Sequence, residues 1–282
     1  AVITTKDMQV VIRNFIKLLS TGAFQSYCTL EEMSEYKWNQ LLYIAKINDV
    51  EDFIISGIIY SDNSSNNIIP TKITNSINET IYSNTTRITP KDDQYRQSTK
   101  TINKFSNSYL NKKLNRIIYN EIHSIDTSVD SITFLNRSID NIKNLLSANS
   151  YIRDLVEYGI YLRKYGNKID FVKIDNWINT LKMNKIMNLV GIYLIKFFNF
   201  DTSEIPFYNN QNKIKTGEIK LPLNLKAKSE DKMNETQKEI NNLICNIPKP
   251  NTGMFKYFSF FPLETTSIFF SNIFNSLSNI EE

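Results

Sequence analysis

The chain has 282 residues, of which 41% are apolar and 12% aromatic, and its formal net charge is +4. A chain of this length and apolar content is able to bury a sizeable core in one large or two small domains. It contains only seven Gly and seven Pro residues, which argues against a β-sandwich and against a glycine-rich cofactor fold. The net charge is small, so it neither indicates nor excludes nucleic-acid binding.

Cysteine content and apolar runs limit the remaining classes. Cys28 and Cys245 lie far apart in the chain and form neither a disulfide framework nor a zinc-binding pattern. The sequence also has no Gly-rich phosphate loop and no His-rich metal pair, so we expect no metal site and no cofactor. The first residues show no basic start followed by an apolar core, as a signal peptide would. The longest apolar run, residues 186–200, is interrupted by a lysine and two asparagines, and it is too polar to cross a bilayer. We expect a cytoplasmic protein.

Residues 1–60 predict an N-terminal helical bundle. Apolar residues recur at helical spacing in three successive segments. The first is expected to begin at Thr5 and to end at Gly22, the second to be capped by Ser34, and the third to start at Asp49.

Residues 61–108 differ from the bundle in composition. Ser, Thr, Asn and Lys dominate this segment, and its apolar residues are isolated. Such a composition predicts a polar linker or short irregular structure. A faint alternation at residues 71–77 is the one indication of an edge strand.

Residues 109–207 predict a central helical core. Five amphipathic segments follow one another with short connections, and they place Trp177 among the inward-facing residues. The expected boundary signals are a capping box at residues 127–130, a stop at Gly166, an N-cap at Asp170 and a second capping box from Asp201 to Glu204.

Residues 208–240 predict a polar loop, and residues 241–282 an aromatic segment followed by an amphipathic helix. The apolar face of that helix is expected to hold Phe269, Phe270, Ile273, Leu277 and Ile280. Taken together, the pattern predicts a mostly α protein, a multi-helix bundle with long polar connecting segments.

Arg116 and His123 form the first candidate site. His123 is the only histidine, and six residues separate it from Arg116. This Arg-x6-His spacing resembles the motif of HEPN-type ribonucleases, in which the arginine holds phosphate and the histidine helps to activate the ribose hydroxyl. The alternative is a surface histidine that caps a helix end.

Arg153, Asp154 and Glu157 form the second candidate site, because they share one helical turn. Arg153 and Glu157 are spaced to pair at i, i+4. The three side chains together are suited to bind a metal or a phosphate group. The alternative is that they tie neighbouring helices together.

The C-terminal helix is the third candidate. Its aromatic face is suited to the interface of a bilayer, together with the preceding aromatic residues Phe255, Tyr257, Phe258, Phe260 and Phe261. Against this, its polar face has no Lys or Arg, and the chain ends in Glu281 and Glu282. The alternative is that the helix docks on the core of the protein itself.

Two segments carry a resemblance to a family. Residues 153–181 (RDLVEYGIYLRKYGNKIDFVKIDNWINTL), a long helix and the Glu-x-Pro-Phe ending at residues 204–207 resemble the distal helices of an uncharacterised bacterial nucleotidyltransferase family. The W-x-x-L-x-x-x-A segment from Trp38 to Ala45 is similar to its N-terminal region. The likeness covers about half of the chain.

The resemblance implies a catalytic module between these two segments, with Gly-Ser and a paired Asp-x-Asp that holds Mg2+. This sequence contains neither Gly-Ser nor Asp-x-Asp, so no catalytic residue of the family is carried over. We therefore expect a non-catalytic helical protein, related to the family's accessory helices, that binds a protein partner. A HEPN-like ribonuclease and a peripheral membrane protein are the alternatives.

Overall fold

The computed structural model describes residues 5–62, 69–70, 73, 102–147, 151–209, 221–224 and 256–278. The regular structure in these ranges is helical, without a strand, and the predicted mostly α fold is confirmed. The α-helices are α1 (Thr5–Phe24), α2 (Glu35–Ile47), α3 (Glu51–Asp62), α6 (Ser108–Ile122), α7 (Val129–Ser147), α8 (Tyr151–Tyr165), α9 (Phe171–Thr180), α10 (Asn184–Phe198) and α13 (Pro262–Ser278). Two single 3-10 turns, η2 (Gly166–Lys168) and η3 (Thr202–Glu204), follow α8 and α10.

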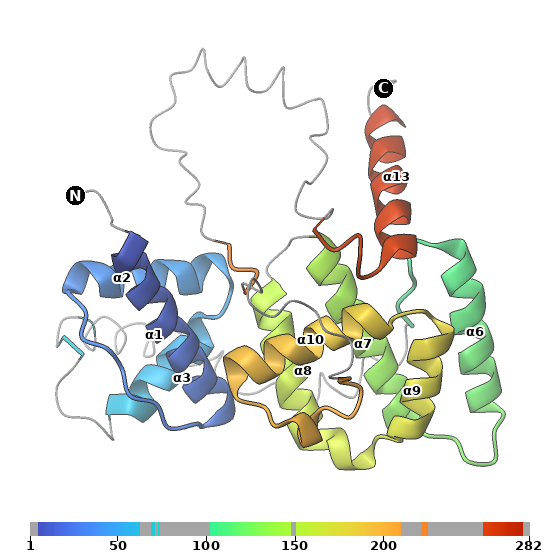
Figure 1. Cartoon of the computed structure of the whole chain (residues 1–282), viewed down its shortest axis with the longest axis horizontal. Coiled ribbons are helices and arrows are strands. Elements are labelled where there is room, and N and C mark those ends of the chain that lie inside the picture. The colour runs from blue at the N-terminus through green and yellow to red at the C-terminus, as the bar shows by residue number, and fades with distance from the viewer. Residues whose placement is uncertain are drawn as a thin grey trace.

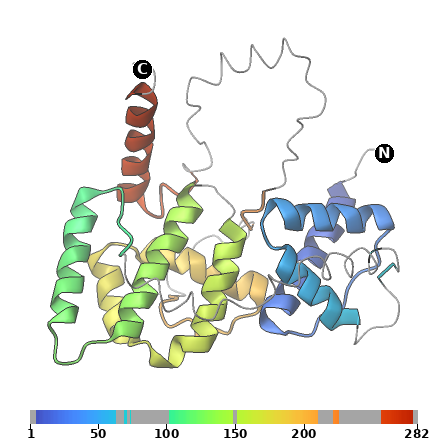
Figure 2. The ribbon, with the colours of Figure 1, turned by 180° about the vertical axis from the view of Figure 1, so that it is seen from behind.

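The helices form two adjoining groups. Figure 1 shows α1 to α3 at one end of the molecule and α6 to α10 at the other, and the view from behind in Figure 2 agrees. Helix α13 projects away from both groups. Of the edge strand expected at residues 71–77, the structure describes Ile73 alone, in a helical conformation. The rest of that stretch, like most of the two polar segments, lies outside the described residues.

Aromatic side chains join the two groups. The ring of Phe24, at the end of α1, lies 5.6 Å from that of Phe198 and 5.2 Å from that of Phe200. The guanidinium of Arg163 stacks 4.0 Å from the centre of the Phe200 ring and forms an ion pair with Glu204 at 2.8 Å. The buried apolar residues of the two groups consequently form one cluster, whose first member along the chain is Val11 and whose last is Phe261. It is wider than the central core that the sequence predicts for residues 109–207.

Helices α1 and α3 cross at two glycines, and this corrects the prediction for Gly22. The residue does not end the first helix, because α1 continues to Phe24. A Cβ atom at Gly22 would lie 1.8 Å from the backbone oxygen of Phe53, and one at Gly57 would lie 2.1 Å from that of Leu18. Gly22 therefore allows the backbones of α1 and α3 to approach each other.

Several boundary signals are confirmed. Asp170 caps α9, because its carboxylate accepts hydrogen bonds from the N–H groups of Val172 and Lys173. Helix α8 ends directly before Gly166. The capping box between Asp201 and Glu204 is present, although it lies at the start of a 3-10 turn and not of an α-helix.

Three other boundary predictions are wrong in detail. Ser34 precedes α2, but its side chain makes no capping hydrogen bond. The capping box predicted at residues 127–130 does not form: the hydroxyl of Ser128 accepts the N–H of Ser131, and the N–H of Ser128 donates to the carboxylate of Glu121. The hydroxyl of Thr127 instead donates to the backbone oxygens of Glu121 and Ser124. The start of α3 also moves: Asp49 lies in the preceding turn at a φ of 55°.

Candidate functional site

Arg116 and His123 lie on the exposed side of α6. His123 is the C-cap of this helix. Its Nδ1 lies 2.7 Å from the backbone oxygen of Tyr119, and its ring lies 4.2 Å from the Tyr119 ring. These contacts hold the imidazole against its own helix, which is what a helix-end histidine does. The ribonuclease reading of the pair stays a prediction.

Arg153 joins α8 to the start of α3. Its guanidinium donates to both carboxylate oxygens of Asp52, at 3.1 and 3.0 Å, and to the backbone oxygen of Asp49. On its own helix it donates to Glu157 at 2.9 Å, as the i, i+4 spacing predicts. This set of acceptors fixes α8 against the N-terminal helices, so the side chain has a clear structural role.

Asp154 and Glu157 line a pocket between α7 and α8. The pocket has a volume of about 190 Å³. The seven lining residues are Arg137, Asp140, Asn141, Asn144, Asp154, Glu157 and Tyr158. The structure thus brings two of the three residues predicted on α8 together with four polar residues of α7. The sequence contains a signal for those four, because positions 137, 140, 141 and 144 follow the i, i+3, i+4, i+7 spacing of one helix face.

The charges in this pocket perturb one another. Burial, followed by the negative charge of Glu157, raises the pKa of Asp154 to about 6, although a hydrogen bond from Asn144 lowers it. Burial also raises the pKa of Asp140, against the lowering effect of Lys143 and Arg137. Carboxyl groups whose pKa values are raised by burial and by like charges are frequent at binding sites.

The base of α13 is fixed to the body of the protein. The buried carboxylate of Glu264 accepts the N–H of Ser106 at 2.6 Å and that of Asn107 at 3.1 Å. The side chain of Asn107 donates in turn to the hydroxyl of Ser267 at 2.9 Å. Burial raises the pKa of Glu264 in spite of the two N–H groups that it accepts. These contacts hold the first turn of α13 in one orientation.

Beyond this base, α13 stands clear of the body, as all three views show. Phe270 is 56% exposed and Phe274 is 66% exposed. Phe269 and Ile273 are half-buried, so the predicted apolar face is not uniformly covered by the core. Leu277 and Ile280 lie where side chains are not described. We call the helical segment 268–274 the α13 arm.

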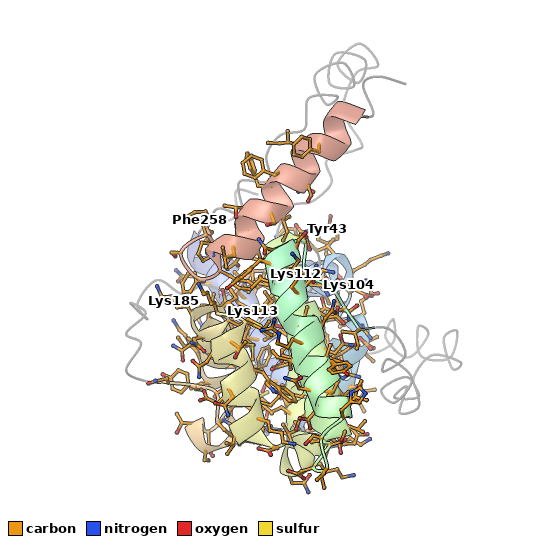
Figure 3. The ribbon with its side chains drawn as sticks, turned by 90° about the vertical axis from the view of Figure 1, so that its right-hand side faces the viewer. Tyr43, Lys104, Lys112, Lys113, Lys185 and Phe258 are labelled. Atoms are coloured by element: carbon orange, nitrogen blue, oxygen red, sulfur yellow. The ribbon has the colours of Figure 1, made fainter. Side chains whose placement is uncertain are left out.

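Lysines gather around the base of the arm (Figure 3). Lys104, Lys112 and Lys185 are exposed. Lys113 donates to the backbone oxygen of Thr180 at 2.9 Å. A hydrogen bond from Lys113 and the positive charges of Lys113 and Lys182 lower the pKa of Tyr109, which is the expected effect of locally concentrated positive charge.

No protein-family model, no curated protein and no solved structure matches this chain. The likeness of its helices to the nucleotidyltransferase family accordingly stays a prediction. Within the described part of the chain, no helix is long and apolar enough to cross a membrane.

Proposed function

We propose that this chain is a non-catalytic helical protein that binds a protein partner through the α13 arm. The observation that supports this is the combination of a fixed base and an exposed aromatic face. Glu264 and Asn107 hold the start of the helix, while Phe270 and Phe274 are exposed to solvent about two and three turns after Glu264. A pre-oriented helix loses little conformational freedom when its apolar face enters a groove.

The charges around the arm favour a partner with an acidic surface. From Pro262 to Ser278 the sequence contains no Lys or Arg, and its one acidic residue, Glu264, is buried. The nearest positive charges include those of Lys112 and Lys185, which surround the base of the arm (Figure 3). An apolar centre beside a charged margin is the usual arrangement of a protein interface, and positive charge at that margin steers an acidic partner into register.

A protein partner accounts for the arm better than a bilayer does. Helices that lie in the membrane interface carry Lys and Arg along their polar face. The polar face of α13 consists of Ser, Thr and Asn residues. The lysines near the base of the arm are not part of α13, since Lys112 belongs to α6 and Lys185 to α10.

Site-specific photo-crosslinking tests this proposal. A photoreactive phenylalanine analogue replaces Phe270 in the cell, and in a matched control it replaces Val172, which is also exposed. We expect one saturable adduct from position 270, lost in a Phe274→Ser background and absent from position 172. The captured protein is then purified, and its affinity for the wild type and for Phe274→Ser is measured by calorimetry.

Three other results would overturn the proposal. Flotation of the protein with anionic vesicles, lost in Phe270→Ser/Phe274→Ser, would assign the arm to a membrane. An adduct of twice the chain mass would assign it to self-assembly. Saturable nucleotide binding in the presence of Mg2+, with transfer of label to a protein or RNA, would show that the protein is catalytic.

A further inference from the structure

The pocket between α7 and α8 holds more negative than positive charge. Asp140, Asp154 and Glu157 contribute three carboxyl groups, and Arg137 is the one basic residue that lines it. The guanidinium of Arg137 stacks 4.5 Å from the centre of the Tyr161 ring. Asp140 also accepts a hydrogen bond from the side chain of Asn103.

A second arginine, Arg153, lies next to the pocket but does not neutralise the negative charge of its carboxyl groups. Arg153 pairs with Glu157 at 2.9 Å, but it also pairs with Asp52 at 3.0 Å and lies 3.8 Å from the carboxylate of Asp49. Its charge is therefore shared among three carboxylates, one of which belongs to the pocket. The pKa of Asp154 is raised first by burial and then by the negative charges of Glu157 and Asp140, against the lowering effects of Asn144 and Arg153.

A second and independent observation concerns Asn141. This pocket-lining residue is 3% exposed. Its Oδ1 accepts a hydrogen bond from the hydroxyl of Tyr151 at 3.0 Å, but its Nδ2 is buried without a hydrogen-bond partner. Buried donors are normally paired, and an unpaired one has a free-energy cost. Asn141 thus brings to the pocket a carboxamide whose Nδ2 has no acceptor within the described part of the protein.

The carboxylates are not arranged as metal ligands. Among the described residues, no three His, Cys, Asp or Glu side chains come together in a way that holds a metal ion. An ammonium nitrogen donates three hydrogen bonds over about 2.7–2.9 Å, so it reaches carboxylates that are further apart than the ligands of a metal ion. The pocket volume of about 190 Å³ suits a molecule of a few heavy atoms.

We propose that this pocket binds a small organic cation that carries a primary ammonium group and, a few bonds away, a hydroxyl or carbonyl oxygen. The ammonium group lies among Asp140, Asp154 and Glu157. The oxygen accepts a hydrogen bond from Nδ2 of Asn141. This site is separate from the α13 arm, and it does not depend on the function proposed for the arm.

Three probes of equal size distinguish the contribution of the ammonium group to binding from that of the oxygen. 4-Amino-1-butanol has both the ammonium group and the oxygen, pentylamine has only the ammonium group, and 1,4-butanediol has no charge. The full chain, labelled with 15N, is titrated with each probe at pH 7.5, and the side-chain amide signal of Asn141 is followed by NMR. We expect saturation with a dissociation constant in roughly the millimolar range for the amino alcohol. Pentylamine binds several-fold more weakly, and butanediol does not saturate.

The pH dependence supplies a further readout. Both amines stay protonated between pH 5 and 7.5, whereas Asp154, with a pKa of about 6, loses most of its charge at the lower pH. Binding of the amino alcohol should therefore be about tenfold weaker at pH 5 than at pH 7.5. In Asp154→Asn the affinity at pH 7.5 falls about tenfold and its dependence on pH becomes weaker, with Asp140, whose pKa is also raised, as the source of what remains. The control Asp175→Asn, at an exposed position on α9, retains the wild-type affinity.

Some results would overturn the proposal. They are the absence of saturation with the amino alcohol, equal binding of all three probes, and an unchanged affinity in Asp154→Asn. The far-UV circular dichroism of Asp154→Asn shows whether the variant is folded. We expect it to fold, because asparagine retains an oxygen that accepts the hydrogen bond from Asn144.

Discussion

The crossing of α1 and α3 allows the sharpest test of the structure. We predict that Gly22→Ala strongly destabilises the protein. The new Cβ would lie 1.8 Å from the backbone oxygen of Phe53 and 2.8 Å from the backbone nitrogen of Gly57. Both are backbone atoms, so no side-chain rotation relieves the clash, and the two helices have to move apart by more than an ångström.

The magnitude follows from what this movement disturbs. Leu18 of α1 and Ile54 and Ile58 of α3 are fully buried around the crossing. Overpacking of a core typically costs about 1–3 kcal/mol, and more where backbone has to shift. The higher helix propensity of alanine returns up to about 1 kcal/mol. We therefore expect Gly22→Ala to lower the free energy of unfolding by roughly 2–4 kcal/mol.

Urea denaturation, followed by far-UV circular dichroism, measures this change. Gly57→Ala should have a similar effect, because its Cβ would lie 2.1 Å from the backbone oxygen of Leu18. Gly166→Ala is the matched control: the nearest atom to its Cβ would be 3.9 Å away, on Leu162. It should change the free energy by at most about 0.5 kcal/mol. If Gly22→Ala unfolds at the wild-type urea concentration, the close crossing of α1 and α3 is wrong.

Four further predictions concern other parts of the molecule. Trp177→Ala should lower the free energy of unfolding by about 3 kcal/mol, because this side chain is only 9% exposed, whereas Lys112→Ala should lower it by less than about 0.5 kcal/mol in the same urea assay. The folded-state pKa of Asp154 is raised from 3.8 to about 6, so its contribution to stability is full below about pH 4 and is lost as the pH rises through about 6. Thermal melts should therefore show Asp154→Asn to be more stable than the wild type at pH 7.5. The stability of this variant should also depend less on pH between pH 4 and 6. Glu264→Ala should release the base of α13 by leaving two backbone N–H groups without their acceptor, at a cost of about 1–3 kcal/mol, and hydrogen exchange should then rise in α13 before it rises elsewhere. Incubation with total RNA should leave the RNA equally intact with the wild type and with His123→Ala, and cleavage by the wild type alone would establish the ribonuclease reading.

The sequence by itself determined the features that depend on neighbours along the chain. Apolar residues at helical spacing placed the helices, because a helix that buries one face repeats every 3.6 residues. The cap at Asp170 and the ion pair of Arg153 with Glu157 span only two to four residues. Short-range hydrogen bonds of this kind are set by spacing alone.

The tertiary structure decided every feature that joins distant segments. Gly22 looks like a helix stop in the sequence, yet its role comes from the backbone of Phe53 on another helix. Asp140 and Asp154 lie on separate helices and share a pocket only because α7 packs against α8. The exposure of Phe270 likewise depends on where Glu264 fixes the base of α13. Helical periodicity states which face of a helix is apolar, but the packing of the whole chain decides whether that face is covered.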